Sequence, residues 1–403
     1  MAREYQPLKR LGVLALHNDD ESFTKELAII SPSFHAISET FIRDHVKRLA
    51  PGRTILLCED GHGAEQFGAP VLSNISSWRH PHSIPDRLAN RVAFYRRTYC
   101  SPALAGADRW RVISYIQQYR PQAMLAEYAT TAALIVDICC ETRTPLYVHF
   151  HGFDASLPDR EPRWRGRYLK LFDQASGVIA PSEFLAAKIV RLGCPSEKLA
   201  VCPCGIDCEK FSPKPKEAGR LLMVGRLVGK KAPHLAIEAF ARIADRFQQF
   251  RLDVVGEGPL RERCESVIRD HKLEGRVILH GAQPSERVRE LMETCSIFLQ
   301  HSVTTENGDT EGLPVAILEA MASGLAVVST RHAGIPEAIE NGKEGILVSE
   351  HDVPGMAHAL AELARSPSLV ERLGSQARAT VSSKYSINIA IARLRELLRL
   401  SVL

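Results

Sequence analysis

Two glutamates in the second half of the chain have a spacing and surroundings suited to binding hydroxyl groups. Glu311 and Glu319 are eight residues apart in the segment DTEGLPVAILEAMASG, with Gly312 and Pro314 between them. Proline fits the first turn of a helix, where its missing N–H leaves no hydrogen bond unmade, so we expect a helix to begin there. A carboxylate accepts two hydrogen bonds from neighbouring hydroxyls, so this pair can hold two sugar rings. The alternative is two solvated glutamates on an ordinary helix.

The start of that expected helix also offers backbone donors. The N–H groups around Gly312 and Leu313 should be exposed, because the first turn of a helix has no internal acceptors for them. A helix N-terminus favours anions. We therefore expect Gly312, Leu313 and Pro314 to form a binding site for a phosphate group or a sugar oxygen.

A group of cations suits a diphosphate. The apolar run LLMV ends in Gly225, Arg226 follows directly, and Lys230 and Lys231 come shortly after. In open α/β sheets ligands bind at the carboxyl ends of the strands, where these cations are expected. An arginine offers a planar fork of donors and a lysine offers a point charge, so Arg226 and Lys231 are the predicted diphosphate ligands. Lys230 is expected to face solvent.

A histidine in the first half stands at the tip of another expected strand. The segment VHFHGFDAS places His151 and Gly152 directly after an apolar run, with Asp154 two residues further on. A histidine in this position can meet a substrate at the edge of a sheet. The alternative is a histidine whose hydrogen bonds are satisfied in the core of the domain. His149 lies on the same strand face, and the sequence assigns it no role.

Two further patterns are too incomplete to predict a cofactor or a metal. The segment VVGEGPL contains Gly256 and Gly258 but lacks the third glycine of a dinucleotide-binding loop, so a nicotinamide cofactor is not expected. Cys202, Cys204 and Cys208 in CPCGIDC form no CxxC pair and have no second pair or histidine at zinc spacing. We therefore expect no metal, and we expect the cysteines to be small buried side chains without disulfides.

The bulk composition narrows the class of protein. The chain has 403 residues, 45% of them hydrophobic, and a net charge of only +4. Its length suits two domains, and its weak charge does not indicate a nucleic-acid partner. No apolar run is long enough to span a bilayer and no signal peptide is recognisable at the start, so a cytoplasmic location is expected.

Basic residues concentrate in the first half of the chain. Most such runs are solvated surface. The alternative is a patch that rests on an anionic membrane or holds an anionic acceptor. The arginines concerned are Arg87, Arg91, Arg96 and Arg97, followed by Arg160, Arg163, Arg165 and Arg167, and the expected helix 39–49 adds Arg43, Lys47 and Arg48.

Strand-like and helix-like segments alternate along the chain, which is typical of an α/β fold with parallel sheets. Strands are expected in the first half at 27–31, 54–58, 124–126, 146–150 and 177–180, and in the second half at 220–224, 251–255, 277–280, 297–300, 326–329 and 345–348. Between two of these strands, Ala236, Phe240, Ile243 and Phe247 recur at helical spacing and should face a sheet.

A stretch rich in proline, lysine and glycine, FSPKPKEAGR, marks a linker between two domains. The predicted domains are residues 1–212 and 213–385. An amphipathic helix at 386–403 ends the chain, with Ile387, Ile391, Leu394 and Leu398 in one stripe.

These motifs occur together and in a fixed order. They are SETFI, HGFD, VIAPSEFLAAKIVRLG, VCPCGIDCEKFSP, VGRLVGKK, VVGEGPL, EGLPVAILEAMASG and GIPEAIENGKEGILV. In this order the sequence resembles glycosyltransferase family 4, from about residue 28 to the end. The resemblance implies a GT-B fold, in which two Rossmann-like domains with doubly wound parallel sheets face each other across a cleft. It also implies that the last helix crosses back onto the first domain, the acceptor side, while the second domain binds the donor.

The resemblance assigns roles to residues that match the family's motifs. It implies that Glu319 holds the ribose hydroxyls of a nucleoside-diphosphate sugar, and that Glu311 contacts the transferred sugar. Arg226 and Lys231 match the pair that grips the diphosphate, and His151 matches the histidine near the reacting centre. The family's reaction retains the anomeric configuration and requires no metal.

Three departures from the family pattern concern the fine geometry of the site. Cys204 replaces the usual asparagine, Ala232 replaces the usual glycine after the second lysine, and FHAISETFI replaces a glycine-rich loop. SETFI and HGFDAS are similar to segments of enzymes that build exopolysaccharide, capsule or glycolipid.

The sequence thus predicts a retaining glycosyltransferase that uses a UDP- or GDP-sugar and a glycan, glycolipid or small-molecule acceptor. The alternatives are a GT-B phosphorylase or epimerase, and a nucleotide-sugar binding protein without turnover.

Overall fold

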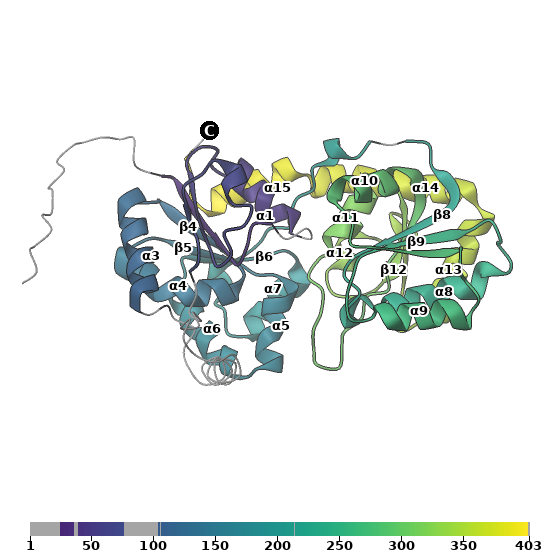
Figure 1. Cartoon of the computed structure of the whole chain (residues 1–403), viewed down its shortest axis with the longest axis horizontal. Helices are drawn as coiled ribbons and strands as arrows, with labels where there is room; N and C mark the ends of the chain where they lie inside the picture. Colours follow the sequence, from purple (N-terminus) through teal and green to yellow (C-terminus); the bar gives the residue numbers. More distant parts are fainter. Residues whose placement is uncertain (1–24, 36–38, 76–103, 105, 213, 402–403) are drawn as a thin grey trace, which may run out of the picture.

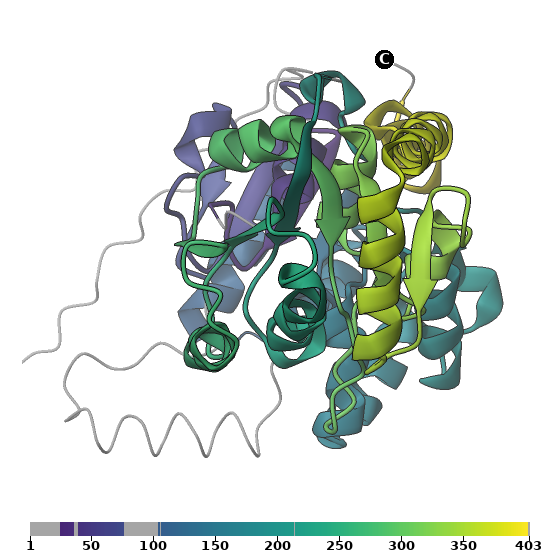
Figure 2. The ribbon, with the colours of Figure 1, turned by 90° about the vertical axis from the view of Figure 1, so that its right-hand side faces the viewer.

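The computed structural model describes residues 25–35, 39–75, 104, 106–212 and 214–401. It contains two parallel sheets, each covered by helices, in two domains that lie side by side along the long axis of the molecule (Figure 1). Turned by 90°, the second domain stands in front of the first (Figure 2). The predicted α/β class with two doubly wound parallel sheets is therefore confirmed.

The first sheet has the strand order β3-β2-β1-β4-β5-β6-β7. All its strand pairs are parallel. The strands are β1 (Leu27–Ser31), β2 (Thr54–Cys58), β3 (Val71–Leu72), β4 (Ala123–Glu127), β5 (Leu146–His149), β6 (Gly177–Ala180) and β7 (Leu199–Val201). The helices are α1 (Thr40–Arg48), α3 (Gly106–Tyr119), α4 (Ala129–Thr142), α5 (Gly152–Arg160), α6 (Arg163–Gln174) and α7 (Glu183–Arg191). The chain reverses its winding between β1 and β4, and ligands bind at such a point in open α/β sheets.

The second sheet has the strand order β10-β9-β8-β11-β12-β13, again all parallel, with its reversal between β8 and β11. The strands are β8 (Glu217–Val224), β9 (Arg251–Val255), β10 (Val277–Gly281), β11 (Cys295–Leu299), β12 (Ala326–Thr330) and β13 (Gly345–Val348). The helices are α8 (Pro233–Ala244), α9 (Arg261–Asp270), α10 (Ser285–Thr294), α11 (Val315–Ala322), α12 (Ile335–Ala338), α13 (Val353–Arg365), α14 (Pro367–Lys384) and α15 (Ile387–Leu397). The predicted boundary at residue 212 lies between β7 and β8.

The last helix, α15, packs on the first domain and not on the second. Its stripe of Ile387, Ile391, Leu394 and Leu398 is buried among residues of β1, β2, β4 and α1. Gly205 permits the crossing, because a Cβ there would lie 2.6 Å from the Ile387 Cα. The chain therefore passes back to the first domain at its end, as the resemblance implied (Figure 1).

Several local predictions need correction. The structure contains two strands that the sequence did not predict, β3 and β7, and their residues are only partly buried. The helix α8 ends at Ala244, so Phe247 lies beyond it, although it still packs against the core of the second domain. The segment before residue 25 and the arginines of 87–97 lie outside the described residues.

Candidate functional site

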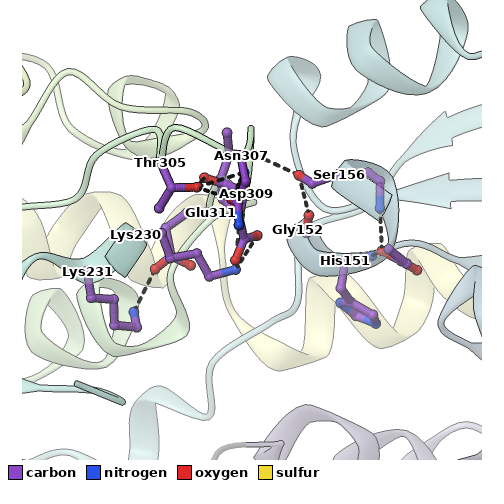
Figure 3. A network of polar contacts seen from close by, with 12 residues as sticks. His151, Gly152, Ser156, Lys230, Lys231, Thr305, Asn307, Asp309 and Glu311 are labelled. Atoms are coloured by element: carbon purple, nitrogen blue, oxygen red, sulfur yellow. Dashed lines mark hydrogen bonds and ion pairs between the residues drawn. The ribbon is translucent and has the colours of Figure 1, made fainter. Parts of the chain in front are cut away.

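The candidate site lies where loops from the two domains meet. Figure 3 shows Lys230, Lys231 and Glu311 of the second domain on one side, and His151, Gly152 and Ser156 of the first domain on the other. The loop after β8 carries the two lysines, and the loop after β11 carries Glu311. These are the two strands between which the second sheet reverses, so the topology brings both loops to one edge.

Lys231 reaches Glu311 because Gly225 leaves room for its side chain. The Lys231 Nζ lies 3.0 Å from Glu311 Oε1. A Cβ on Gly225 would lie 2.7 Å from the Lys231 Cδ, so the lysine passes directly over the glycine. Ala232, the residue after Lys231, has a φ of 33°, in the left-handed region. This explains why glycine is usual at the position, and Ala232 holds the conformation at a cost in strain.

Lys230 is buried, so the expectation that it faces solvent is wrong. Only 6% of the residue is exposed. Its Nζ donates to the carbonyl oxygen of Thr310 at 3.0 Å and lies 3.3 Å from the Asp309 Oδ1. Its own carbonyl accepts from the Val303 N–H at 2.9 Å. Lys230 therefore fastens the loop that carries Glu311.

A histidine and a second carboxylate hold Glu311 from the other side. The Glu311 backbone N–H donates to His332 Nε2 at 3.1 Å, and His332 Nδ1 lies 2.6 Å from Glu350 Oε1. Since Nε2 accepts, the proton of the neutral ring sits on Nδ1 and is donated to Glu350. Burial raises the pKa of Glu311, but Lys231 and Lys230 outweigh it and hold the pKa below its usual value. Glu311 is therefore an ionised carboxylate.

The sequence predicted exposed backbone N–H groups at residues 312–314, and the structure does not show them. Gly312, Leu313 and Pro314 are all buried. A Cβ on Gly152 would lie 2.7 Å from the Thr310 carbonyl oxygen and 2.8 Å from the Gly312 nitrogen, so the first domain covers this segment directly. Pro314 is also not in the first helical turn, since it is the N-cap residue of α11, which begins at Val315.

Glu319 lies on α11 as expected, half-buried and more than one turn into the helix. Burial raises the pKa of its carboxyl group to about 7. Lys210 counteracts this shift and Asp44 adds to it. Because Asp44 belongs to α1, Glu319 is within electrostatic reach of the first domain.

His151 is the N-cap residue of α5. Its backbone N–H donates to Asp154 Oδ1 at 2.7 Å, and the other carboxylate oxygen accepts from the Ala129 N–H at 2.7 Å. Asp154 thereby links α5 to the start of α4. Burial lowers the pKa of the His151 imidazole to about 4, against the opposing hydrogen bond to Glu127. The ring is therefore neutral at pH 7.

Arg226 lies two residues after β8 and is exposed, so it stands at the strand end where the sequence placed it. The two glycines of VVGEGPL have a packing role. A Cβ on Gly256 would lie 2.0 Å from the Gly225 carbonyl oxygen, and one on Gly258 would lie 2.5 Å from that of Leu227. They let the loop after β9 support the loop that carries Arg226.

The sequence interpretation missed Glu127, which lies behind His151. Its side chain has no exposure and accepts from His151 Nε2 at 3.2 Å. Burial raises the pKa of Glu127, but His45 and His149 outweigh it and hold the pKa well below its usual value. An acidic residue directly at the end of the apolar strand Ala123–Glu127 is the signal that could have identified it.

Glu337 was also missed, although its motif was noted. It lies on α12 of the second domain, and its carboxylate accepts from the backbone N–H groups of Glu183 and Phe184, both at 2.8 Å. These are the first residues of α7 in the first domain. A carboxylate at a helix N-terminus satisfies donors that lack partners within the helix. Glu337 thus joins the two domains beside the site.

Two family models match the chain in succession. Glycosyltransferase Family 4 matches residues 39–210, and Glycosyl transferases group 1 matches residues 207–380. WcaL of Escherichia coli, which is provisionally named a colanic acid biosynthesis glycosyltransferase, is 39% identical over 53% of this chain and 53% of its own length. AmsK of Erwinia amylovora, named an amylovoran biosynthesis glycosyltransferase, is 37% identical over 62% of each chain. The chain thus spans between half and two thirds of the length of these relatives.

Among solved structures, HepE of Anabaena in complex with UDP has a TM-score of 0.74 at 19% identity. The alignment covers 93% of this chain and all of that one. At this identity the likeness concerns the fold, which is GT-B. Within the described residues, none of the helices is both long and apolar enough to cross a bilayer.

Replacing Glu319 by glutamine should stabilise the protein more at high pH than at low pH. A carboxyl group with a raised pKa in the folded state costs stability as pH rises from its unfolded value towards about 7, and glutamine does not carry this cost. Thermal unfolding of Glu319→Gln and wild type at about pH 5 and about pH 8.5 measures this difference. The exposed Glu371→Gln on α14 is the control. An equal effect of Glu319→Gln at both pH values would contradict the raised pKa of Glu319.

Replacing Glu337 by alanine should loosen the start of α7. Loss of a carboxylate that satisfies a helix N-terminus costs about 1 kcal/mol, so the amides of Glu183 and Phe184 should exchange with solvent several-fold faster. Hydrogen exchange followed by mass spectrometry measures this. Glu340→Ala, an exposed glutamate three residues away, should leave the exchange unchanged. Identical exchange in both variants would show that Glu337 does not hold the domains together.

Proposed function

Because the chain belongs to the family 4 glycosyltransferases, we propose that it transfers a sugar with retention of anomeric configuration. The donor is a UDP- or GDP-sugar, and the acceptor is a hydroxyl of a glycan, glycolipid or small molecule. One observation carries this proposal. The ion pair between Lys231 and Glu311 lies at the edge of the second sheet, facing the loop with His151 and Gly152 (Figure 3).

The donor is held by the second domain. Arg226 and Lys231 bind the diphosphate, and Glu319 accepts hydrogen bonds from the ribose hydroxyls. Glu311 contacts hydroxyls of the transferred sugar, and the buried segment of Gly312, Leu313 and Pro314 holds Glu311 in place against the first domain. The exposure of Arg226 and the raised pKa of Glu319 support these roles, because both side chains gain partners when an anionic nucleotide with a diol binds.

The reaction proceeds on one face of the sugar. The acceptor oxygen forms a bond to the anomeric carbon as the bond from that carbon to the diphosphate oxygen breaks. The proton of the acceptor hydroxyl passes to the departing phosphate. Arg226 and Lys231 stabilise the negative charge that develops on the diphosphate, which is usually the largest contribution to such catalysis. His151, neutral and fixed by Glu127, lies beside the reacting centre.

Transfer requires no metal in this proposal, because the Arg226 and Lys231 cations match the negative charge of the diphosphate. Treatment with EDTA should leave the rate of transfer undiminished. A rate that falls on chelation and returns with Mg²⁺ or Mn²⁺ would contradict this.

The relatives named for colanic acid and amylovoran biosynthesis favour a glycan or glycolipid acceptor. A lipid-linked acceptor requires contact with an anionic membrane. The helices α5, α6 and α7 lie together on the first domain (Figure 1). They carry the exposed apolar residues Phe153, Leu169, Phe184 and Val190, and the exposed Arg160 and Arg165. This combination suits a membrane surface, which attracts cations and accepts apolar side chains.

Replacing Arg226 and Lys231 together by alanine should slow transfer about 100-fold or more, because loss of even one well-placed donor has an effect of this size. The assay follows a labelled UDP- or GDP-sugar into membrane extract, with free phosphate as a second acceptor to detect a phosphorylase. Lys343→Ala, a half-exposed lysine on the same domain, is the control. A near-normal rate in the double variant would refute the assignment of these two residues.

Vesicles that contain anionic lipid should float with the wild-type protein, and charge reversal of Arg160 and Arg165 to glutamate should weaken this association. Each basic residue near an anionic surface contributes about 1 kcal/mol. The control reverses Arg263 and Arg269, two exposed arginines of α9 in the second domain. Wild-type protein that stays entirely below the vesicles would exclude the membrane contact.

A further inference from the structure

Five side chains that are good metal ligands meet inside the first domain. His45 comes from α1, Glu127 from the end of β4, His149 from the end of β5, His151 from the N-cap of α5 and Cys204 from the loop after β7. We call them the His–Glu–Cys cluster. Four of the five are buried, and the side chain of His151 is 13% exposed, so the cluster reaches the candidate site through that one ring.

The ligand atoms form two groups of three that share His149. In each group, His149 with His151 and Cys204, and His149 with His45 and Glu127, the atoms lie within 4.8 Å of one another. Glu127 connects the groups. Its Oε1 is 2.6 Å from His45 Nδ1, and its Oε2 is 3.2 Å from His151 Nε2.

The hydrogen bonds of the cluster are incomplete. His149 has no exposure. Its Nδ1 lies 3.3 Å from Glu127 Oε2, and its Nε2 has no hydrogen-bond partner. The Nε2 of His45 is likewise buried without a partner. A buried polar atom left unpaired costs about 1–3 kcal/mol, and a metal ion bound by the lone pair of the nitrogen removes that cost. The Nε2 of His149 therefore points to a ligand, whereas His45 lies outside the proposed ligand set.

The chemistry of the donors indicates which ligand. Two imidazoles and a thiolate suit a borderline-soft divalent ion such as Zn²⁺, and a fourth position can hold water. The charges also balance, because the dication is matched by the Cys204 thiolate and the Glu127 carboxylate. Glu127 then orients His149 from behind, through the Nδ1 that lies 3.3 Å from its Oε2. The His151 ring contacts Glu127 through Nε2 and also accepts from the Asp154 N–H, so it exchanges one of these two hydrogen bonds for the ion.

We propose that His149, His151 and Cys204 bind one zinc-like divalent ion, with Glu127 supporting the histidines. The Cys204 thiol loses its proton to solvent as the ion binds. Because His151 also lies beside the reacting centre, the filled site competes with transfer, and the ion acts as an inhibitor and not as a cofactor. This site was invisible to motif spacing, since Cys204 comes from a different segment of the chain than the two histidines.

The test uses Co²⁺ as a spectroscopic probe on full-length protein from which metals have been removed by chelation. We expect one Co²⁺ per chain, with the intense visible bands of a tetrahedral site and a near-ultraviolet charge-transfer band from the thiolate. Zn²⁺ should displace the Co²⁺ and abolish both the visible bands and the charge-transfer band. No stoichiometric binding, or binding without the thiolate band, would overturn the proposal and leave Glu127 and the histidines as a purely hydrogen-bonded network.

Matched variants identify the ligands. Cys204→Ser should lose the charge-transfer band, whereas Cys202→Ser, a buried thiol two residues away, should keep it. Glu127→Gln should weaken Co²⁺ binding about 10- to 100-fold, as loss of a supporting carboxylate does. If Cys204→Ser does not fold, the Co²⁺ titration of the wild type still shows whether a thiolate-containing metal site exists. The readout uses neither nucleotide nor acceptor, so its failure leaves the proposed transferase activity untouched.

Discussion

The close approach of Gly152 to the backbone of residues 310–312 is the contact on which the site depends. A Cβ on Gly152 would lie within 2.9 Å of three backbone atoms there, so only glycine lets the two domains come this near. The contact places the start of α5, with His151, against the loop that carries Glu311. Glu337 adds a second link by accepting two N–H groups of α7. One site is thereby built from two sheets that share no strand.

The two domains stabilise a buried, ionised carboxylate in different ways. In the second domain, Glu311 is ionised because Lys231 and Lys230 neutralise it, and both lysines are held by the fold. In the first domain, Glu127 is buried among imidazoles instead of fixed cations. A fixed cation gives a carboxylate one permanent partner, whereas an imidazole can exchange a proton for an ion. The first arrangement suits the binding of an anionic donor, and the second offers donor atoms to the metal ion proposed above.

Much of the fold followed from the sequence, because parallel strands buried on both faces leave largely apolar runs such as those at 27–31 and 54–58. The strands β3 and β7 did not follow, since edge strands with half-buried residues lack that signature. The positions of Glu311 and His151 were predictable because each stands directly before a glycine, Gly312 and Gly152. Lys230 was not, because its burial depends on Asp309 and Thr310, about eighty residues later in the chain. Contacts of this kind leave no local pattern.

The central claim is that the second domain holds a nucleoside diphosphate through Glu319, and a thermal-shift panel with UDP, GDP and ADP tests it most directly. A ligand present at about 100 times its dissociation constant stabilises the folded state by about 2.7 kcal/mol, which amounts to a shift of several degrees. The account predicts that UDP or GDP raises the unfolding temperature of the wild type and has little effect on Glu319→Ala. Equal shifts in both proteins, or no shift with any of the three nucleotides, would contradict it.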